Sequence, residues 1–234
     1  MFEMWNKIIV DYIEIRNRFI DENRRTSASF NFFKFRFFYV GETQHSYLLQ
    51  LLLDPHGSHG QGNLFLREFL LMNQIEKPEE GTWQVTAEQG RIDVLIKRVT
   101  EPKSVIIIEN KSHNAVDQKY QLYRYWEQEM VRPLLSKNQG FNEVKEFINS
   151  HPENFKLLYL APNRNKKPSD HSLRRPEGEE WNAYDKILPM KHIHITFNNE
   201  IVTWLEQCKI QLSNDNHRLR EYLDQYIEIC KGIN

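Results

Sequence analysis

Cysteine is almost absent from this chain: Cys208 and Cys230 are the only two among its 234 residues. Two cysteines are too few for a disulfide framework or a cysteine-rich zinc site, and they fit a reduced cytoplasmic compartment. No apolar run reaches the length of a membrane span, and residues 1–5 lack the pattern of a signal peptide. We therefore expect a cytoplasmic protein with no membrane partner.

A net charge of either sign is also missing, since 31 Lys and Arg residues face 32 Asp and Glu residues. This balance excludes a protein that coats nucleic acid through an overall basic field, so a nucleic-acid partner would have to meet a local basic patch. The apolar content of 40% is ample for a core and excludes global disorder. The chain length suits one α/β domain, and a second full domain is not expected.

Residues 1–234 are therefore expected to form a single domain with helical additions at both ends. The pattern predicts an amphipathic helix within residues 1–30, a core at about 40–200 and helices within 200–231. The stretch Phe30–Val40 is extremely aromatic, and its pattern does not separate a strand from the start of a helix.

The core reads as alternating helices and strands that predict a mixed central sheet flanked by helices. In chain order, the sequence predicts helices at 42–53 and 64–70, strands at 83–87, 91–96 and 105–111, a helix at about 115–130, a strand at 155–160, a long basic surface loop at 163–190, a strand at 192–197, and helices near 200–211 and 214–231.

Acidic residues mark the two β-branched runs at 91–96 and 105–111, and a turn separates the runs. Side chains alternate along a strand, so Glu109 and Lys111 share one face and Asn110 points to the other. Asp93 lies across from this pair if the two strands form a hairpin. The sequence therefore predicts two carboxylates and one ammonium group at the same edge of the sheet.

Two carboxylates suit a hard divalent cation such as Mg²⁺ or Mn²⁺, and a lysine suits a phosphate. Asp93 and Glu109 are the expected metal ligands, and the backbone carbonyl of Asn110 can add a third oxygen. Lys111 can contact a phosphate, stabilise developing negative charge or help to deprotonate water. Glu42 is a candidate for a further metal contact, and Gln121 is a candidate for orienting a phosphate or water.

The order Asp93 followed by Glu109-x-Lys111 resembles the PD-(D/E)XK nuclease superfamily, although Ile92 stands where the family name has proline. Gln121-Leu122-x-x-Tyr125 looks like the Q-x-x-x-Y helix motif of several of its branches. Three upstream segments resemble one bacterial branch: Glu42-Thr43-Gln44-His45-Ser46, Leu51-Leu52-Leu53-Asp54-Pro55, and Ser58-His59-Gly60-Gln61-Gly62 with Phe65-Leu66. The resemblance covers residues 31–125 and, more loosely, the strand at 155–160.

The resemblance implies a restriction-endonuclease-like α-β-β-β-α-β core and a Mg²⁺-dependent nuclease site. The implied site residues are Glu42, Asp93, Glu109, Lys111 and Gln121. A nucleic-acid substrate is implied, with DNA favoured over RNA, and the family suggests a role in genome defence or DNA processing. Neither strandedness nor homodimer formation follows from these residues.

Plainer interpretations stay open at this point. Glu109 and Lys111 can form a surface ion pair, Glu42 is already explained by the dipole of its helix, and Tyr125 can be a core residue. The histidines around 45–59 do not have the spacing of a zinc site. The basic residues of the 163–190 segment can grip phosphates or simply be solvated: Arg164, Lys166, Lys167, Arg174 and Arg175. The rival function is a binding module that keeps the fold without turnover.

Overall fold

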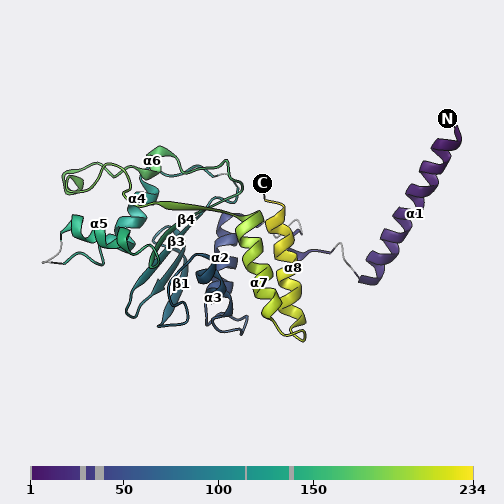
Figure 1. The fold of residues 1–234 in the computed structure, drawn as a ribbon. Coiled ribbons are helices and arrows are strands. Elements are labelled where there is room, and N and C mark those ends of the chain that lie inside the picture. The colour runs from purple at the N-terminus through teal and green to yellow at the C-terminus, as the bar shows by residue number, and fades with distance from the viewer. Residues whose placement is uncertain (1, 27–29, 35–39, 114, 137–139, 234) are drawn as a thin grey trace. The chain divides into compact units, whose positions relative to one another are not determined.

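A five-stranded sheet forms the centre of the larger part of the structure (Figure 1). The computed structural model describes residues 2–26, 30–34, 40–113, 115–136 and 140–233. The chain divides into two compact units, Met1–Tyr39 and Val40–Asn234, and the sheet belongs to the second unit.

The first unit contains one long helix, α1 (Phe2–Thr26), and one 3-10 turn, η1 (Phe32–Lys34). The helix agrees with the amphipathic pattern of the sequence. Within the aromatic stretch, the described structure consists of this turn, and residues 35–39 lie outside the described ranges.

The sheet is mixed, and its strands are ordered as they occur in the chain. The first three strands pair in antiparallel fashion, and the third, fourth and fifth pair in parallel. The third and fourth strands are buried along their whole length, as expected of central strands with helices on both faces. The strands are β1 (Trp83–Gln89), β2 (Ile92–Arg98), β3 (Ser104–Asn110), β4 (Phe155–Ala161) and β5 (His192–Thr196).

Helices cover both faces of the sheet (Figure 1). One face carries α2 (Glu42–Leu53), α3 (Leu64–Met72), α7 (Val202–Gln211), which follows the π-helical stretch η4 (Phe197–Ile201), and α8 (His217–Lys231). The other carries α4 (Gln121–Trp126), its π-helical continuation η2 (Glu127–Val131), α5 (Phe141–Ser150) and the short α6 (Asp170–Leu173). Among the described helices, none combines the length and apolar character that a membrane span requires.

The order of these strands and helices confirms the expected α-β-β-β-α-β core with a mixed sheet.

The helix expected at about 115–130 begins six residues late, at Gln121. Residues before it form a loop, and Tyr120 has a left-handed backbone with φ of 64°. Gln118 appeared to share a helix face with Gln121, but it lies outside the helix and donates its backbone N–H to Oε1 of Gln121 at 3.0 Å. The three-residue spacing of Gln118 and Gln121 suggested a shared helix face. A hydrogen bond between a helix residue and the loop just before the helix can have the same spacing, so the spacing alone did not mark the start of the helix.

The 163–190 segment is largely an exposed loop, as expected, but it also contains ordered pieces that the sequence did not predict. It contains α6 and the turn η3 (Glu179–Trp181), and Arg174 pairs with Ile187 in an isolated β-bridge. Five of its apolar side chains join or pack against the core on the α4 face: Leu173, Trp181, Tyr184, Leu188 and Met190. Prolines and charges dominate its composition, so the sequence showed no periodicity from which this packing could be predicted. The last helix also begins at His217 rather than at 214.

Candidate active site

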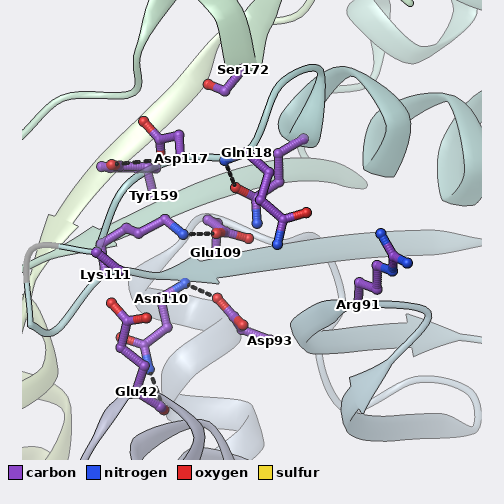
Figure 2. Close-up of polar contacts among 12 residues, drawn as sticks. Glu42, Arg91, Asp93, Glu109, Asn110, Lys111, Asp117, Gln118, Tyr159 and Ser172 are labelled. Carbon is purple, nitrogen blue, oxygen red and sulfur yellow. Dashed lines mark hydrogen bonds and ion pairs between the residues drawn. The ribbon is translucent and has the colours of Figure 1, made fainter.

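The hairpin of β2 and β3 brings Asp93 and Glu109 to the same end of the sheet. Val94 pairs with Ile108 in the antiparallel ladder, so Asp93 and Glu109 are the next facing positions. Oδ2 of Asp93 accepts a hydrogen bond of 2.5 Å from the backbone N–H of Asn110. The hairpin that the turn and the alternation predicted therefore places the first carboxylate against the end of β3 (Figure 2).

Glu109 and Lys111 form a buried ion pair, not the surface pair of the plainer interpretation. Nζ of Lys111 lies 2.6 Å from Oε1 of Glu109, and the two side chains are 6% and 0% exposed. Both come from one face of the strand end, as period-two alternation requires. Burying two charges is costly unless they are paired, so this placement is maintained against a desolvation penalty.

Burial raises the pKa values of both carboxyl groups, and repulsion from other carboxylates adds to the rise. Burial is the larger cause for Glu109, and the Asp93 carboxylate adds to it, so the pKa of Glu109 lies well above its ordinary value. Burial raises the pKa of Asp93 to about 7, although the Asn110 N–H and the Lys111 ammonium oppose the rise. Burial alone would lower the pKa of Lys111, but Glu109 and Asp93 raise it. The site holds more negative charge than its own cation neutralises.

Asn110 ties the start of α2 to the end of β3. Its side-chain amide donates to the backbone carbonyl of Glu42 at 2.8 Å and to Oγ of Ser46 at 3.2 Å. Glu42 is the first residue of α2, and its carboxylate lies beside Asn110 in Figure 2. The structure thus brings the first-turn glutamate to the same corner as Asp93 and Glu109.

Gln121 begins α4 and faces Tyr125 one turn later. Its Nε2 donates to the Tyr125 hydroxyl at 3.0 Å, and that hydroxyl donates to the backbone carbonyl of Arg91. The Arg91 side chain extends away from the carboxylates (Figure 2). Gln121 and Tyr125 therefore link α4 to the residue that precedes β2, the strand that carries Asp93.

A family model of the PD-(D/E)XK nuclease superfamily matches residues 30–228, which is most of the chain and contains every residue described in this site. The chain belongs to the PD-(D/E)XK nuclease superfamily. No curated protein and no solved structure matched it.

A further acid, Asp117, lies buried close to this candidate site, and sequence reasoning missed it. Asp117 is 5% exposed, and its carboxylate accepts from the Tyr159 hydroxyl at 3.1 Å and from the Ser169 N–H at 2.7 Å. Tyr159 pairs with Glu109 across β3 and β4. Asp117 adds to the negative charge that raises the pKa of Glu109. No spacing signal marks Asp117, because its partners come from β4 and from the 163–190 segment.

The oxygen atoms of the site fit a hard divalent cation. Within the described ranges, no group of three or more His, Cys, Asp or Glu side chains surrounds a common metal position. Mg²⁺ does not need one, because one or two carboxylates and waters commonly hold it. Apart from the ion pair with Lys111, both carboxylate oxygens of Glu109 lack a hydrogen-bond partner, and so does Oε1 of Glu42. A divalent cation would satisfy such buried oxygens and oppose their repulsion.

Proposed function

We propose that this PD-(D/E)XK protein is a divalent-metal-dependent nuclease that hydrolyses phosphodiester bonds in DNA. The observation that carries the proposal is the pair of the half-buried Asp93 and the buried Glu109, both with raised pKa values, together with the unsatisfied oxygens of Glu109 beside Lys111. A purely structural ion pair would not need a second carboxylate at this corner, because each added like charge costs stability.

Asp93, Glu109 and the backbone carbonyl of Asn110 would hold Mg²⁺ or Mn²⁺ in this proposal, with Glu42 as a further contact. The bound ion supplies positive charge for the phosphate oxygens and lowers the pKa of a water molecule. The support is chemical, since carboxylate and carbonyl oxygens are the donors that these cations prefer.

Lys111 and Gln121 would act on the phosphate itself. The Lys111 ammonium, held at 2.6 Å by Glu109, can contact a non-bridging oxygen and stabilise the negative charge that develops during hydrolysis. The Nε2 group of Gln121 has two hydrogens and donates one to Tyr125. The other can orient a phosphate oxygen or the attacking water.

Cleavage assays on a mixed substrate panel test the proposal. Linear duplex, supercoiled plasmid, single-stranded DNA and RNA are incubated with Mg²⁺, Mn²⁺ or EDTA. We expect the wild type to cut DNA only with a metal, and Lys111→Ala to lower the rate by a factor of about 10² to 10³. Glu109→Ala should lose both cleavage and the metal binding measured by calorimetry, whereas Lys111→Ala should retain metal binding.

Lys77→Ala and Glu80→Ala are matched controls, because these residues form an exposed ion pair of the same chemistry on another segment. Both controls should cleave at the wild-type rate. Full activity of Lys111→Ala would contradict the proposed mechanism. A wild type that binds DNA but cuts no substrate with either metal would instead identify a binding module on this fold.

A further inference from the structure

A pocket with a volume of about 500 Å³ lies between the loop before α4 and the segment around α6 and η3. We call it the basic pocket and define it by four basic side chains, Lys119, Arg174, Arg175 and Lys186, and one carboxylate, Glu177. These five side chains give it a net charge of +3, in a chain whose overall formal charge is −1. Glu179 and Glu180 follow in sequence but do not line it.

Backbone pairing holds the walls of the basic pocket in place. Arg174 bridges to Ile187, and the Arg175 N–H donates to the Lys186 carbonyl at 3.1 Å. The Arg175 guanidinium donates to the carbonyl of Tyr184 at 3.1 Å and to that of Trp181, so it serves as part of the wall.

The charges of Arg174 and Lys186 make no contact that stabilises the described part of the fold. Both side chains are exposed, and within the described residues neither makes an ion pair or a side-chain hydrogen bond. Two unpaired cations, placed by a paired backbone segment, are available to an anion. The solvated-loop interpretation requires no such pocket and no such pairing.

Glu177 already places an anionic group in the basic pocket. Its Oε1 accepts from the Tyr120 hydroxyl at 2.7 Å and from Nζ of Lys119 at 3.1 Å, while 85% of its side chain remains exposed. A carboxylate and a phosphate oxygen accept the same kinds of hydrogen bonds. Because the glutamate is held only at the rim, a phosphate can displace it at little cost.

The basic pocket is connected to the proposed active site through the loop that precedes α4. Lys119 and Tyr120 are the two residues between Gln118 and Gln121, which are hydrogen-bonded to each other. The Tyr120 N–H donates to the His171 carbonyl at 2.8 Å, and a ring nitrogen of His171 lies 2.9 Å from the carbonyl of Asp117. The residues that line the pocket at positions 119 and 120 thus lie next in sequence to Gln121 of the proposed active site.

We propose that the basic pocket binds a backbone phosphate of the nucleic-acid strand and that Glu177 occupies the phosphate position in the free protein. The proposal rests on the proposed nuclease function for the identity of the ligand. Arg174 and Lys186 contact the phosphate together with Lys119 and the Tyr120 hydroxyl. Because such contacts read the backbone and not the bases, the pocket adds affinity without base specificity.

Fluorescence anisotropy with a labelled DNA duplex and its labelled single strand, in EDTA across a salt series, tests the pocket without cleavage. Arg174→Ala/Lys186→Ala should raise Kd about tenfold at ~0.1 M salt and reduce the salt slope by about one per lost phosphate contact. Glu177→Gln should lower Kd by a factor of about two to three, since a competing carboxylate is removed. The matched control Lys103→Ala/Arg218→Ala removes the same two charges from exposed positions elsewhere.

Unchanged Kd and salt slope in Arg174→Ala/Lys186→Ala would overturn the proposal, as would an equal loss in the control pair. Weaker binding by Glu177→Gln would also overturn it, because an anion in the phosphate position must compete. All binding is measured in EDTA, where no cleavage is expected. The binding test of the pocket is therefore valid even if the wild type never cleaves DNA. Conversely, suppose that the wild type cleaves DNA with a metal while Arg174→Ala/Lys186→Ala binds DNA as the wild type does. That result would reject the proposal for the basic pocket and leave the proposed nuclease function standing.

Discussion

Burial raises the pKa values of both Asp93 and Glu109, and the Asp93 carboxylate adds to the rise at Glu109, which is the clearest electrostatic feature of the site at the scale of single residues. Two ionised carboxylates in a buried corner destabilise the metal-free fold, because their solvation is lost and their charges repel. Active sites commonly retain groups that lower stability in return for function. The free energy of unfolding measured without metal therefore tests the charges of this site without any assay of catalysis.

Asp93→Asn should be more stable than the wild type in EDTA near pH 8, on the order of 2 kcal/mol in the free energy of unfolding. Asparagine can still accept the Asn110 N–H but carries no charge. The folded pKa of about 7 lies above the ordinary value of 3.8, so the wild type regains stability as it takes up a proton below pH 7. Urea denaturation at several pH values should show the advantage of the variant disappearing near pH 4.

Asp215→Asn is the matched control, because Asp215 is exposed. It should change stability by less than about 0.5 kcal/mol at any of these pH values. Adding Mg²⁺ should then stabilise the wild type more than Asp93→Asn. A variant that is less stable than the wild type in EDTA at high pH would show that Asp93 is a structural anion.

The convergence of these residues was largely predictable, and the reason is local. Strand alternation and a short turn determine that Asp93, Glu109 and Lys111 meet, and both features depend on neighbours in sequence. The burial of Asp117 was not predictable, because it depends on Tyr159 and Ser169, which lie more than forty residues away.

At the scale of elements, α2 is held between the sheet and the C-terminal helix α8. From β3, the Asn110 side chain donates to the backbone carbonyl of Glu42 in the first turn of α2. On the other side, Nδ1 of His45 in α2 lies 3.0 Å from the Tyr226 hydroxyl of α8. Both His45 and Tyr226 are almost completely buried. The position of Glu42 therefore depends on packing from two directions.

The α2–α8 contact should make stability depend on pH. Burial, with a smaller effect from His113, lowers the pKa of His45 from 6.5 to about 3. The unfolded chain therefore binds a proton between pH 6.5 and pH 3 that the folded chain does not, so folding becomes less favourable as pH falls. His45→Gln removes this proton uptake, so wild type should lose about 2 kcal/mol relative to the variant between about pH 7.5 and pH 5.

Chemical denaturation of both proteins at both pH values measures this difference. Comparing the two proteins cancels the groups that titrate equally in each, including the carboxylates of the site. A pH-independent difference between wild type and His45→Gln would show that His45 accepts a proton in the folded protein.

Most helix and strand positions followed from periodicity, but α5 was not predicted and the start of α4 was placed too early. β3 and β4 were predictable because their apolar runs are of strand length. The end of α2 was predictable because Pro55 interrupts the helical pattern. The start of α4 and the folding of the 163–190 segment depend on contacts with each other, such as the 2.8 Å bond from Tyr120 to His171.

At the scale of the whole molecule, both cysteines lie in the helical layer formed by α7 and α8. Cys208 and Cys230 are free thiols with no exposed surface, and burial raises the pKa of each thiol. Thiolate is the reactive form, so both should be inert while the larger unit stays folded.

Labelling with a chromogenic disulfide reagent tests this expectation on the full chain. We expect no reaction of either thiol under native conditions at neutral pH and two thiols titrated in denaturant. The labelling rate should then follow global or subglobal opening of the fold. Rapid native labelling of Cys208 or Cys230 would mean that the α7–α8 layer opens independently of the sheet.

The sequence by itself determined the class of the fold, the strands that form the centre of the sheet and the three residues Asp93, Glu109 and Lys111 at its edge. These follow from period-two and period-3.6 patterns and from turn residues, which act over a few positions. Only the tertiary structure decided the burial of the ion pair, the approach of Asp117 and the basic pocket around Arg174 and Lys186. These depend on contacts between segments far apart in the chain, and neither composition nor local periodicity records such contacts.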